Sequence, residues 1–541
     1  MVTSPRVTGM AMAGQLAGTR RQRQCGESAP SHGSLLHSGH GLLPFRGLGQ
    51  GTLRDATRAV AGTADGRRQC AATEIFLAFS RDLHVDLVPA TGREGCTTMT
   101  STMTMIRAEP WAPHAAAATE STSDPQNRRY TTTANGTLSC CGGWQFVYGG
   151  VASGHRYRIS WEGVWRDLAE PLDALVGHVY WGDIATDCYA PGTATVWDYV
   201  CAEIDEGVAR FSAQLIAPEG VSVVTVRNSL RWTAGGSVVM SEPTVLDLGA
   251  HQQRAPVRVA VATGTEASCR EPRADVQQCV DHYLGLAQQA CQQEGAELVA
   301  LPEICLQWRV PGHPYDGAVE VPGPETDGFA DLARAHDAVI VVGLHERCGH
   351  AVYNSAVVID ADGSIAGIYH KVHLASTEAL NGILPGDGFP VMETGVGRVG
   401  STICMDSSAA ESARMIGLNG AEFLVLPIMG DHRASTWHLG PPEFDEERWR
   451  CIQRTRAMDN QLCMVVARNM GRGSCIIDRS GEVLAYNDGN QELVVADVAL
   501  DDGFRKWNGG CFRQVNWRQR RPHLYGAYAS DDPAATRILR A

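Results

Sequence analysis

Three segments of the chain place a reactive side chain directly after a run of apolar residues. The sequences VALPE, IAGIYHK and VGSTIC end at Glu303, Lys371 and Cys404. Such runs are typical of buried strands, and side chains at the ends of neighbouring strands can share one pocket. A carboxylate, an ammonium and a thiol in one pocket supply a general base, a charge stabiliser and a nucleophile.

The chemistry that these groups support is covalent catalysis by sulfur. A free thiol is only a few per cent ionised at neutral pH, so Cys404 needs a base or a cation beside it to attack an amide. The attack forms a thioester and releases an amine or ammonia, after which Glu303 can activate water to hydrolyse the thioester. Lys371 can stabilise the oxyanion that develops at each addition. The three residues therefore predict an acyl-transfer hydrolase.

The scarcity of lysine supports a specific role for Lys371. The chain has 46 basic residues, and only Lys371 and Lys506 among them are lysines. Arginine replaces lysine well on a surface, but not where a compact ammonium is needed. A lysine that remains in a chain with so strong a preference for arginine is therefore a strong candidate for a site residue.

The neighbouring polar residues have simpler interpretations. Most of the 17 cysteines are expected to be small buried hydrophobic residues. We expect Asp406 to cap the following helix, Asn354 to fix a turn, and the two histidines near Lys371, His370 and His373, to be structural. The His, Cys, Asp and Glu residues do not show the spacing of a metal site, so neither a metal nor another cofactor is predicted.

The three reactive residues lie in a region, residues 256–500, where strands alternate with helices. Residues 257–261 alternate as in a strand, residues 276–287 have helical spacing, and residues 339–344 form an apolar run. Strands that alternate with helices predict a layered α/β domain.

Residues 126–250 show a different pattern, in which short alternating strands are separated by turns. Tyr157, Ile159 and Trp161, for example, share one face of a predicted strand. Repeated short strands with glycine-containing turns predict an all-β sandwich of the jelly-roll type. The six tryptophans of this region are expected to fill its core in preference to forming a ligand platform.

The two ends of the chain lack such patterns. Residues 1–125 are rich in small and polar residues without periodicity, which predicts a disordered extension and linker that is dispensable for activity. Residues 501–541 are polar and arginine-rich, and we expect them to pack as a tail on the α/β domain or on a partner subunit.

Composition narrows the class of protein. The net charge of −14 argues against a nucleic-acid partner, and no run of 18 apolar residues predicts a span of a membrane. The cysteines are odd in number and irregularly spaced, and the chain begins without an apolar signal segment. These features predict reduced thiols and a cytoplasmic protein.

Residues 257–498 resemble the nitrilase superfamily of carbon–nitrogen hydrolases. Besides the three reactive residues, this region contains further segments of the family, in the order that the family has. They are GAE before LPE, then VGL, YNSA, IDADGSIAGIYHKVHL, GAE with LVLP, RAMDN and SGE. The resemblance implies a four-layer α-β-β-α sandwich that assembles as a homodimer or larger homo-oligomer.

The resemblance also implies a Glu-Lys-Cys triad. In it Cys404 is the nucleophile and Glu303 is the base. Lys371 stabilises the oxyanion, aided by the backbone N–H of Met405. Glu378, seven residues after the lysine, matches a second acidic residue of the family's pocket.

We expect the substrate to be a small-molecule amide, and the residues after the nucleophile indicate which kind of amide the site accepts. True nitrilases of the family generally have Cys-Trp-Glu, whereas this chain has Cys404-Met405-Asp406. Carbamoyl-amino-acid hydrolases often continue with an arginine that pairs with a carboxylate, whereas here residues 407–410 are SSAA, which favours an uncharged or weakly polar amide. An N-carbamoyl hydrolase and a nitrilase remain alternatives.

An alternative of a different class is a binding protein. Residues 154–161 and 230–248 weakly resemble segments of jelly-roll carbohydrate-binding modules. In that reading the sandwich binds a carbohydrate or another ligand, and the α/β domain is an inactive scaffold. The intact Glu303, Lys371 and Cys404 favour the enzyme.

Overall fold

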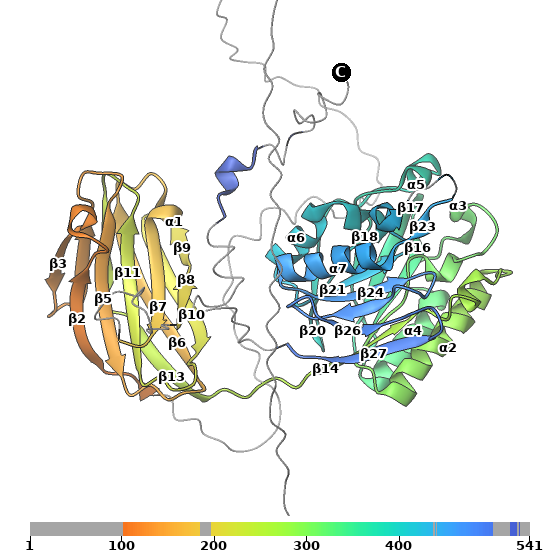
Figure 1. Cartoon of the computed structure of the whole chain (residues 1–541), viewed down its shortest axis with the longest axis horizontal. Coiled ribbons are helices and arrows are strands. Elements are labelled where there is room, and N and C mark those ends of the chain that lie inside the picture. Colours follow the sequence, from red (N-terminus) through yellow and green to blue (C-terminus); the bar gives the residue numbers. More distant parts are fainter. Residues whose placement is uncertain are drawn as a thin grey trace, which may run out of the picture. The chain divides into compact units, whose positions relative to one another are not determined.

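The computed structural model describes residues 101–183, 196–436, 439, 441–500, 520–526 and 530. They form an all-β region and a mixed α/β region, joined by a short segment that follows residue 250 (Figure 1). The extension predicted over residues 1–100 lies outside the described residues.

The all-β region consists of two antiparallel sheets. The first has the order β1-β13-β6-β12-β4-β3, with β10 paired to β6 and β9 paired to β10, and the second has the order β2-β5-β11-β7-β8. The strands of the first sheet are β1 (Ser101–Thr102), β3 (Glu120–Asp124), β4 (Arg129–Thr133), β6 (His155–Arg166), β9 (Ala202–Asp205), β10 (Val208–Ile216), β12 (Ser237–Ser241) and β13 (Thr244–Ala250). Those of the second are β2 (Met105–Trp111), β5 (Cys141–Gly149), β7 (Leu175–Trp181), β8 (Val196–Val200) and β11 (Val223–Arg231). Two short helical turns, η1 (Ala115–Ala117) and α1 (Pro171–Ala174), complete the region.

Alternate side chains of these strands form one shared core. The predicted face of β6 is buried, and Trp161 stacks on Phe211 of β10 with ring centroids 4.7 Å apart. Trp144 and Trp181 of the second sheet are also buried in this core, whereas Trp232 is 48% exposed. The expectation that tryptophans fill the core is confirmed for the three buried ones.

The prediction that residues 1–125 form a disordered extension is wrong for residues 101–125. Strand β2 pairs with β5 at an edge of the second sheet, and β3 pairs with β4 at an edge of the first. Neither strand could be recognised from the sequence. Because β2 is only partly buried and β3 is almost wholly exposed, neither shows a clear alternation of apolar and polar residues. The described part of the all-β region therefore includes residues 101–125, and the predicted boundary at residue 126 is wrong.

The α/β region contains two six-stranded sheets. The first has the order β18-β17-β16-β15-β14-β27 and the second has the order β19-β20-β21-β24-β25-β26. The first comprises β14 (Val257–Ala262), β15 (Leu298–Ala300), β16 (Val339–Cys348), β17 (Ala351–Ile359), β18 (Ile365–His370) and β27 (Leu493–Val498). The second comprises β19 (Val391–Thr394), β20 (Gly397–Ser401), β21 (Phe423–Ile428), β24 (Cys463–Arg468), β25 (Cys475–Ile477) and β26 (Val483–Tyr486). A small hairpin is formed by β22 (Ser435–Thr436) and β23 (Glu443–Phe444).

Helices connect and cover these strands. The α-helices are α2 (Val276–Glu294), α3 (Pro314–Gly317), α4 (Pro324–His336), α5 (Ser376–Leu380), α6 (Ala410–Leu418) and α7 (Glu446–Asn460). Short 3-10 turns are η2 (Ser268–Arg270), η3 (Cys305–Gln307), η4 (Cys404–Ser408) and η5 (His432–Ala434). Helix α2 begins where Asp275 accepts a hydrogen bond from the N–H of Gln278, and it ends at Gly295, whose left-handed conformation suits glycine.

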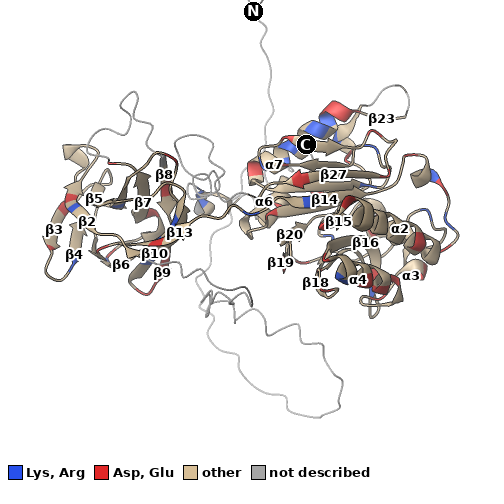
Figure 2. Ribbon diagram, turned by 90° about the horizontal axis from the view of Figure 1, so that it is seen from below, with Lys and Arg blue, Asp and Glu red and all other residues tan. Residues whose placement is uncertain are grey.

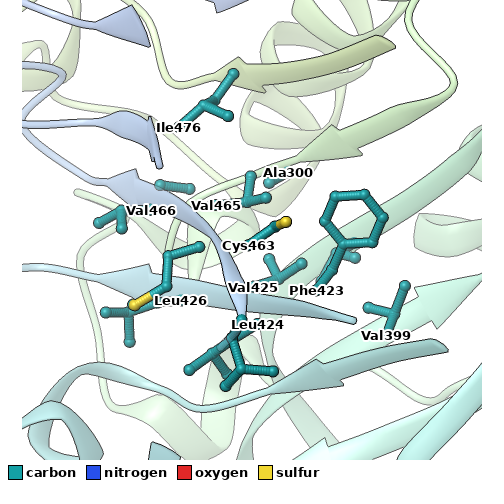
Figure 3. Close-up of a cluster of buried hydrophobic side chains, with 14 of the residues drawn as sticks. Ala300, Val399, Phe423, Leu424, Val425, Leu426, Cys463, Val465, Val466 and Ile476 are labelled. Atoms are coloured by element: carbon teal, nitrogen blue, oxygen red, sulfur yellow. The ribbon is translucent and has the colours of Figure 1, made fainter. Parts of the chain in front are cut away.

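Two hydrophobic clusters hold the layers of this region together. In β15, Leu298 and Ala300 face the second sheet, whereas Val299 belongs to a cluster beneath α2 and α4. This alternation is the two-residue period of a strand that is buried on both faces. Figure 3 shows Ala300 of the first sheet beside Val425 and Val465 of the second, in the cluster that joins the two sheets.

Charged residues are concentrated outside these clusters. Figure 2 shows both charge signs on α7, while most of the visible strand surfaces are uncharged. The helix carries four arginines and three acidic residues in 15 positions, and only four of its residues are buried. No helix among the described residues is long and apolar enough to span a membrane.

Most of the predicted C-terminal tail lies outside the described residues. In its described part, which includes η6 (Pro522–Leu524), Arg521 forms an ion pair with Asp173 at 3.0 Å and lies over the ring of Trp232. Both partners belong to the all-β region, a contact that the sequence did not predict. The guanidinium finds there a carboxylate and an aromatic face, which are its usual partners.

Candidate active site

Strand ends bring the predicted residues together. Glu303 follows β15 in the first sheet, and Lys371 follows β18 directly. Cys404 follows β20 in the second sheet and begins the turn η4. The two sheets pack face to face, so residues that the sequence separates widely lie at one edge of the shared core.

A buried ammonium lies at the centre of this site. The Nζ of Lys371 donates to Glu303 Oε1 at 2.9 Å and to Glu378 Oε2 at 2.7 Å. Lys371 is 1% exposed and Glu303 is 5% exposed, so this ion-pair network is shielded from water. The geometry brings together Glu303, Lys371 and Glu378, the three charged residues that the family resemblance places in one pocket.

Asn354, which the sequence analysis assigned to a turn, is part of the same network. It lies in β17, and its side-chain amide donates to Glu303 Oε1 at 2.9 Å and to Glu378 Oε1 at 2.6 Å. The second oxygen of Glu303 accepts the backbone N–H of Met429 at 2.9 Å. These donors fix both carboxylates, and loss of the Asn354 amide would leave Glu378 Oε1 without this donor.

The backbone around the site is strained at two positions. Cys404 has a φ of +44° and Ile304, which follows Glu303, has a φ of +43°. Left-handed conformations of non-glycine residues cost about 1–3 kcal/mol and are concentrated at functional sites. These two conformations turn the chain sharply after each strand and direct the side chains of Glu303 and Cys404 toward the pocket.

The nucleophile candidate is a buried thiol in its resting state. Cys404 is 9% exposed, and its Sγ lies 3.8 Å from the carbonyl oxygen of Gly430. Burial and the negative charge of Glu303 raise the pKa of the thiol to about 12, against the opposing effect of Lys371. The thiol therefore needs to transfer its proton to a base as it attacks.

The ammonium is charged at all ordinary pH values. Burial alone would lower the pKa of Lys371, but Glu303, Cys404 and Glu378 together outweigh burial and raise it. A lysine held in this way cannot serve as a general base near neutral pH. It is suited to stabilise negative charge on a substrate oxygen.

Asp406 connects the segment of the lysine to that of the cysteine. Its buried carboxylate accepts the hydroxyl of Tyr369 at 2.6 Å and both the backbone N–H and the ring Nδ1 of His373, at 2.9 and 2.8 Å. It also accepts the backbone N–H of Ile403 at 2.9 Å. The expectation that Asp406 caps the following helix is wrong, because the N-cap of α6 is Ala409. Asp406 instead lies within η4 and ties the end of β18 to this turn.

The remaining residues near the site have supporting positions. His370 stacks on Tyr353 with ring centroids 4.1 Å apart and contacts Glu346 at 2.8 Å, which agrees with its expected structural role. Met405 follows Cys404 in η4 and has a partly exposed side chain. No group of three or more potential metal ligands is found among the described residues.

Comparison with known proteins gives this geometry a context. Residues 258–504 match the family described as carbon-nitrogen hydrolase. A probable nitrilase from Schizosaccharomyces pombe is 31% identical over 219 residues, which are 38% of this chain and 76% of that protein. This chain belongs to the nitrilase superfamily of carbon–nitrogen hydrolases.

Other members of the nitrilase superfamily show a similar relationship. A citrullinase from Francisella tularensis is 31% identical and covers 36% of this chain and 71% of its own. An omega-amidase from Xenopus tropicalis is 30% identical and covers 39% of this chain and 79% of its own. The matched segment contains Glu303, Lys371, Glu378 and Cys404. The α/β region is accordingly a nitrilase-type fold, and the chain is a carbon–nitrogen hydrolase.

Proposed function

We propose that the chain is an amidase that cleaves a linear, non-peptide amide through a thioester on Cys404. The observation that carries this proposal is the buried ammonium of Lys371 between Glu303 and Glu378, at the strand ends that also present Cys404. In this arrangement a nucleophile, a base and a fixed positive charge are available without a cofactor.

The reaction that we propose has two additions to one carbonyl carbon. The sulfur of Cys404 bonds to the carbonyl carbon while its proton passes to Glu303, and the oxyanion is held by Lys371 and the backbone N–H of Met405. The C–N bond then breaks, and Glu303 returns the proton to the leaving ammonia or amine. Water, deprotonated by Glu303, then attacks the thioester carbon, the C–S bond breaks, and Glu303 returns the proton to the sulfur of Cys404 as the carboxylic acid leaves. Glu378 holds the ammonium of Lys371 from its other side.

The proposal is tested with purified full-length protein and a library of amides, N-carbamoyl compounds and nitriles. We expect an amide to be hydrolysed and the peptide that contains Cys404 to gain the mass of the acyl group. Cys404→Ala should lose both turnover and adduct, yet keep its melting temperature within a few degrees, because alanine is a small core residue. Cys451→Ala, which removes an exposed thiol of α7, is the matched control and should retain both signals.

The results of this library also decide between the alternatives. Undiminished hydrolysis by Cys404→Ala would exclude the covalent mechanism. Preferred turnover of an N-carbamoyl compound or a nitrile would replace the amide assignment while retaining the triad. An absence of turnover, together with glycan binding by the all-β region, would support the binding-protein alternative.

We further propose the finer architecture and assembly. The two α/β sheets and their helices would form the family's four-layer α-β-β-α sandwich, and the all-β region a jelly roll. The protein would be cytoplasmic and would assemble as a homodimer or larger homo-oligomer. Light scattering on the eluted protein tests the assembly, and a monomeric mass at micromolar concentration would contradict it.

A further inference from the structure

A buried histidine outside the triad lies on the same sheet face as the ion-pair network. His345 is in β16, and its register partner in β17 is Asn354. The backbone oxygen of Asn354 accepts the N–H of Lys371 at 2.9 Å, which adds one more pair to the register of β17 and β18. Register partners on adjacent strands project their side chains from one face. His345, Asn354 and Lys371 therefore form a row across three neighbouring strands.

The segment that carries the base follows the same face of β16. Gly343, two residues before His345, is on the same side of the strand. A Cβ on Gly343 would lie 3.0 Å from the Cα of Glu303, so the backbone of the base crosses the strand there. The side chain of Gln307 accepts the backbone N–H of His345 at 2.8 Å. Residues 303–307 thus run along this face from Gly343 to His345.

Two polar atoms of the row have no partner. The amide nitrogen of Asn354 donates to Glu303 and Glu378, which identifies Oδ1 as an acceptor that points elsewhere. Asn354 is 1% exposed and His345 is 7% exposed, yet neither Asn354 Oδ1 nor His345 Nδ1 has a hydrogen-bond partner among the described residues. Buried polar atoms are nearly always hydrogen-bonded. Two unpaired atoms beside reactive groups therefore indicate that a bound molecule supplies their partners.

The imidazole of His345 is uncharged at neutral pH. Burial lowers its pKa to about 4, and the nearby ammonium of Lys371 acts in the same direction, against the opposing effect of Glu378. A neutral imidazole that carries its proton on Nε2 presents a lone pair at Nδ1. The row thus offers two neutral acceptors, Nδ1 of His345 and Oδ1 of Asn354, to a group with two hydrogen-bond donors.

The scissile nitrogen of a primary amide is such a group. In the tetrahedral intermediate on Cys404 this nitrogen has two N–H bonds and a lone pair, and the lone pair must take a proton from Glu303 before the C–N bond breaks. With standard amide dimensions, Asn354 Oδ1 lies no more than about 5.5 Å from Glu303 Oε1. One nitrogen about 2.9 Å from each oxygen can bridge that span.

We propose that His345 and Asn354 bind the leaving nitrogen of the substrate. Nδ1 of His345 and Oδ1 of Asn354 accept hydrogen bonds from its two N–H groups, and Glu303 gives its proton to the lone pair as the C–N bond breaks. Ammonia then leaves as a neutral molecule. The inference rests on the proposed amidase function and assigns to His345 a part in the first half of that reaction.

The test compares two substrates that share an acyl group and differ in the leaving group. They are the amide of the library with the highest kcat/KM and the methyl ester of the same acid, whose leaving oxygen carries no hydrogen. Because kcat/KM covers the steps up to release of the leaving group, the later hydrolysis of the thioester does not affect it. His345→Leu removes both ring nitrogens. It should lower kcat/KM for the amide by about 10- to 100-fold and change that for the ester by no more than a few-fold.

Two polar variants identify the atom that acts. His345→Asn places an amide atom near the position of Nδ1, whereas His345→Gln places one near the position of Nε2. We expect His345→Asn to retain more of the amide kcat/KM than His345→Leu, and His345→Gln to resemble His345→Leu. His336→Leu, in the last turn of α4, is the matched control and should leave both substrates unaffected. The comparison of His345→Asn with His345→Gln decides alone if His345→Leu does not fold or if wild-type protein does not accept the ester.

The contradicting outcomes are distinct from one another. An equal loss for amide and ester would overturn the inference, because His345 would then support the pocket as a whole. Wild-type kcat/KM of His345→Leu on the amide would overturn it as well, and so would a better rescue by His345→Gln than by His345→Asn. If wild-type protein hydrolyses no amide, the proposed amidase function itself is wrong.

Discussion

Lys371 has a position that a larger cation cannot reproduce. Its ammonium fits between two buried carboxylates, with Nζ to oxygen distances of 2.9 and 2.7 Å. A guanidinium is wider and planar, and it tends to form a bidentate pair with a single carboxylate. In this pocket such a pair would occupy Glu303, the base that the thiol needs.

We therefore expect Lys371→Arg to be nearly as damaging as Lys371→Ala. Loss of one oxyanion donor lowers kcat by about 10²–10³ in well-studied hydrolases, and the occupied base should add to this. The measurement is kcat for both variants on the best amide substrate. Lys506→Arg, at the second lysine, lies outside the described residues and serves as the control, with near wild-type kcat. Near wild-type kcat for Lys371→Arg would exclude Lys371 from the triad.

At the level of single residues, the sequence predicts reactive groups better than the groups that hold them. Glu303, Lys371 and Cys404 were identifiable because each ends an apolar run. Asn354 was assigned to a turn because its partners, Glu303 and Glu378, come from distant segments. One feature could have indicated that Asn354 belongs to the site. It lies in β17, which pairs with β18, the strand that leads to Lys371.

The elements of the site are joined by a single carboxylate. Asp406 lies in η4 and bonds to residues on both sides of Lys371, so the turn of the nucleophile and the end of β18 are held as one unit. This hydrogen-bonded contact raises the pKa of His373, against the opposing effect of burial. The protonated histidine is therefore favoured in the folded protein.

The sign of the resulting pH dependence follows from that shift. A histidine whose pKa is raised on folding stabilises the protein fully below its unfolded pKa of about 6.5, and the stabilisation is lost as pH rises through the folded pKa. We expect the difference in melting temperature between wild type and His373→Asn to be larger at pH 5.5 than at pH 8.5. His350→Asn, at an exposed turn, should show no such trend, and a trend of opposite sign for His373→Asn would contradict the proposed pairing.

Among the elements, those with strong periodicity were predicted best. The helix expected over residues 276–287 is α2, and the run over residues 339–344 is β16. Strands β2 and β3 were missed because an edge strand is stabilised by backbone pairing with a neighbour, which leaves little trace in its own sequence. The buried strands could therefore be predicted from the sequence, whereas the edge strands could not.

For the whole molecule, the corrected boundary gives a test by truncation. A chain that begins at residue 126 lacks β2 and β3, whereas one that begins at residue 101 keeps them. We expect the shorter chain to melt at a lower temperature or to precipitate, because removal of β2 exposes the edge of β5 and the apolar residues Met105 and Ala108 no longer cover the core. Equal melting temperatures for the two chains would show that β2 and β3 contribute nothing to stability.

The pairing of β14 with β27 has a topological consequence. Val257, at the start of the α/β region, is the register partner of Val498 near its end, so the two ends lie about one strand spacing apart. A domain whose entry and exit coincide can be cut out, inserted into a loop of another protein or circularly permuted without stretching its backbone. Joining residues 257 and 498 by a short glycine-rich linker and opening the chain elsewhere should thus preserve the catalytic pocket while freeing both former ends for fusion.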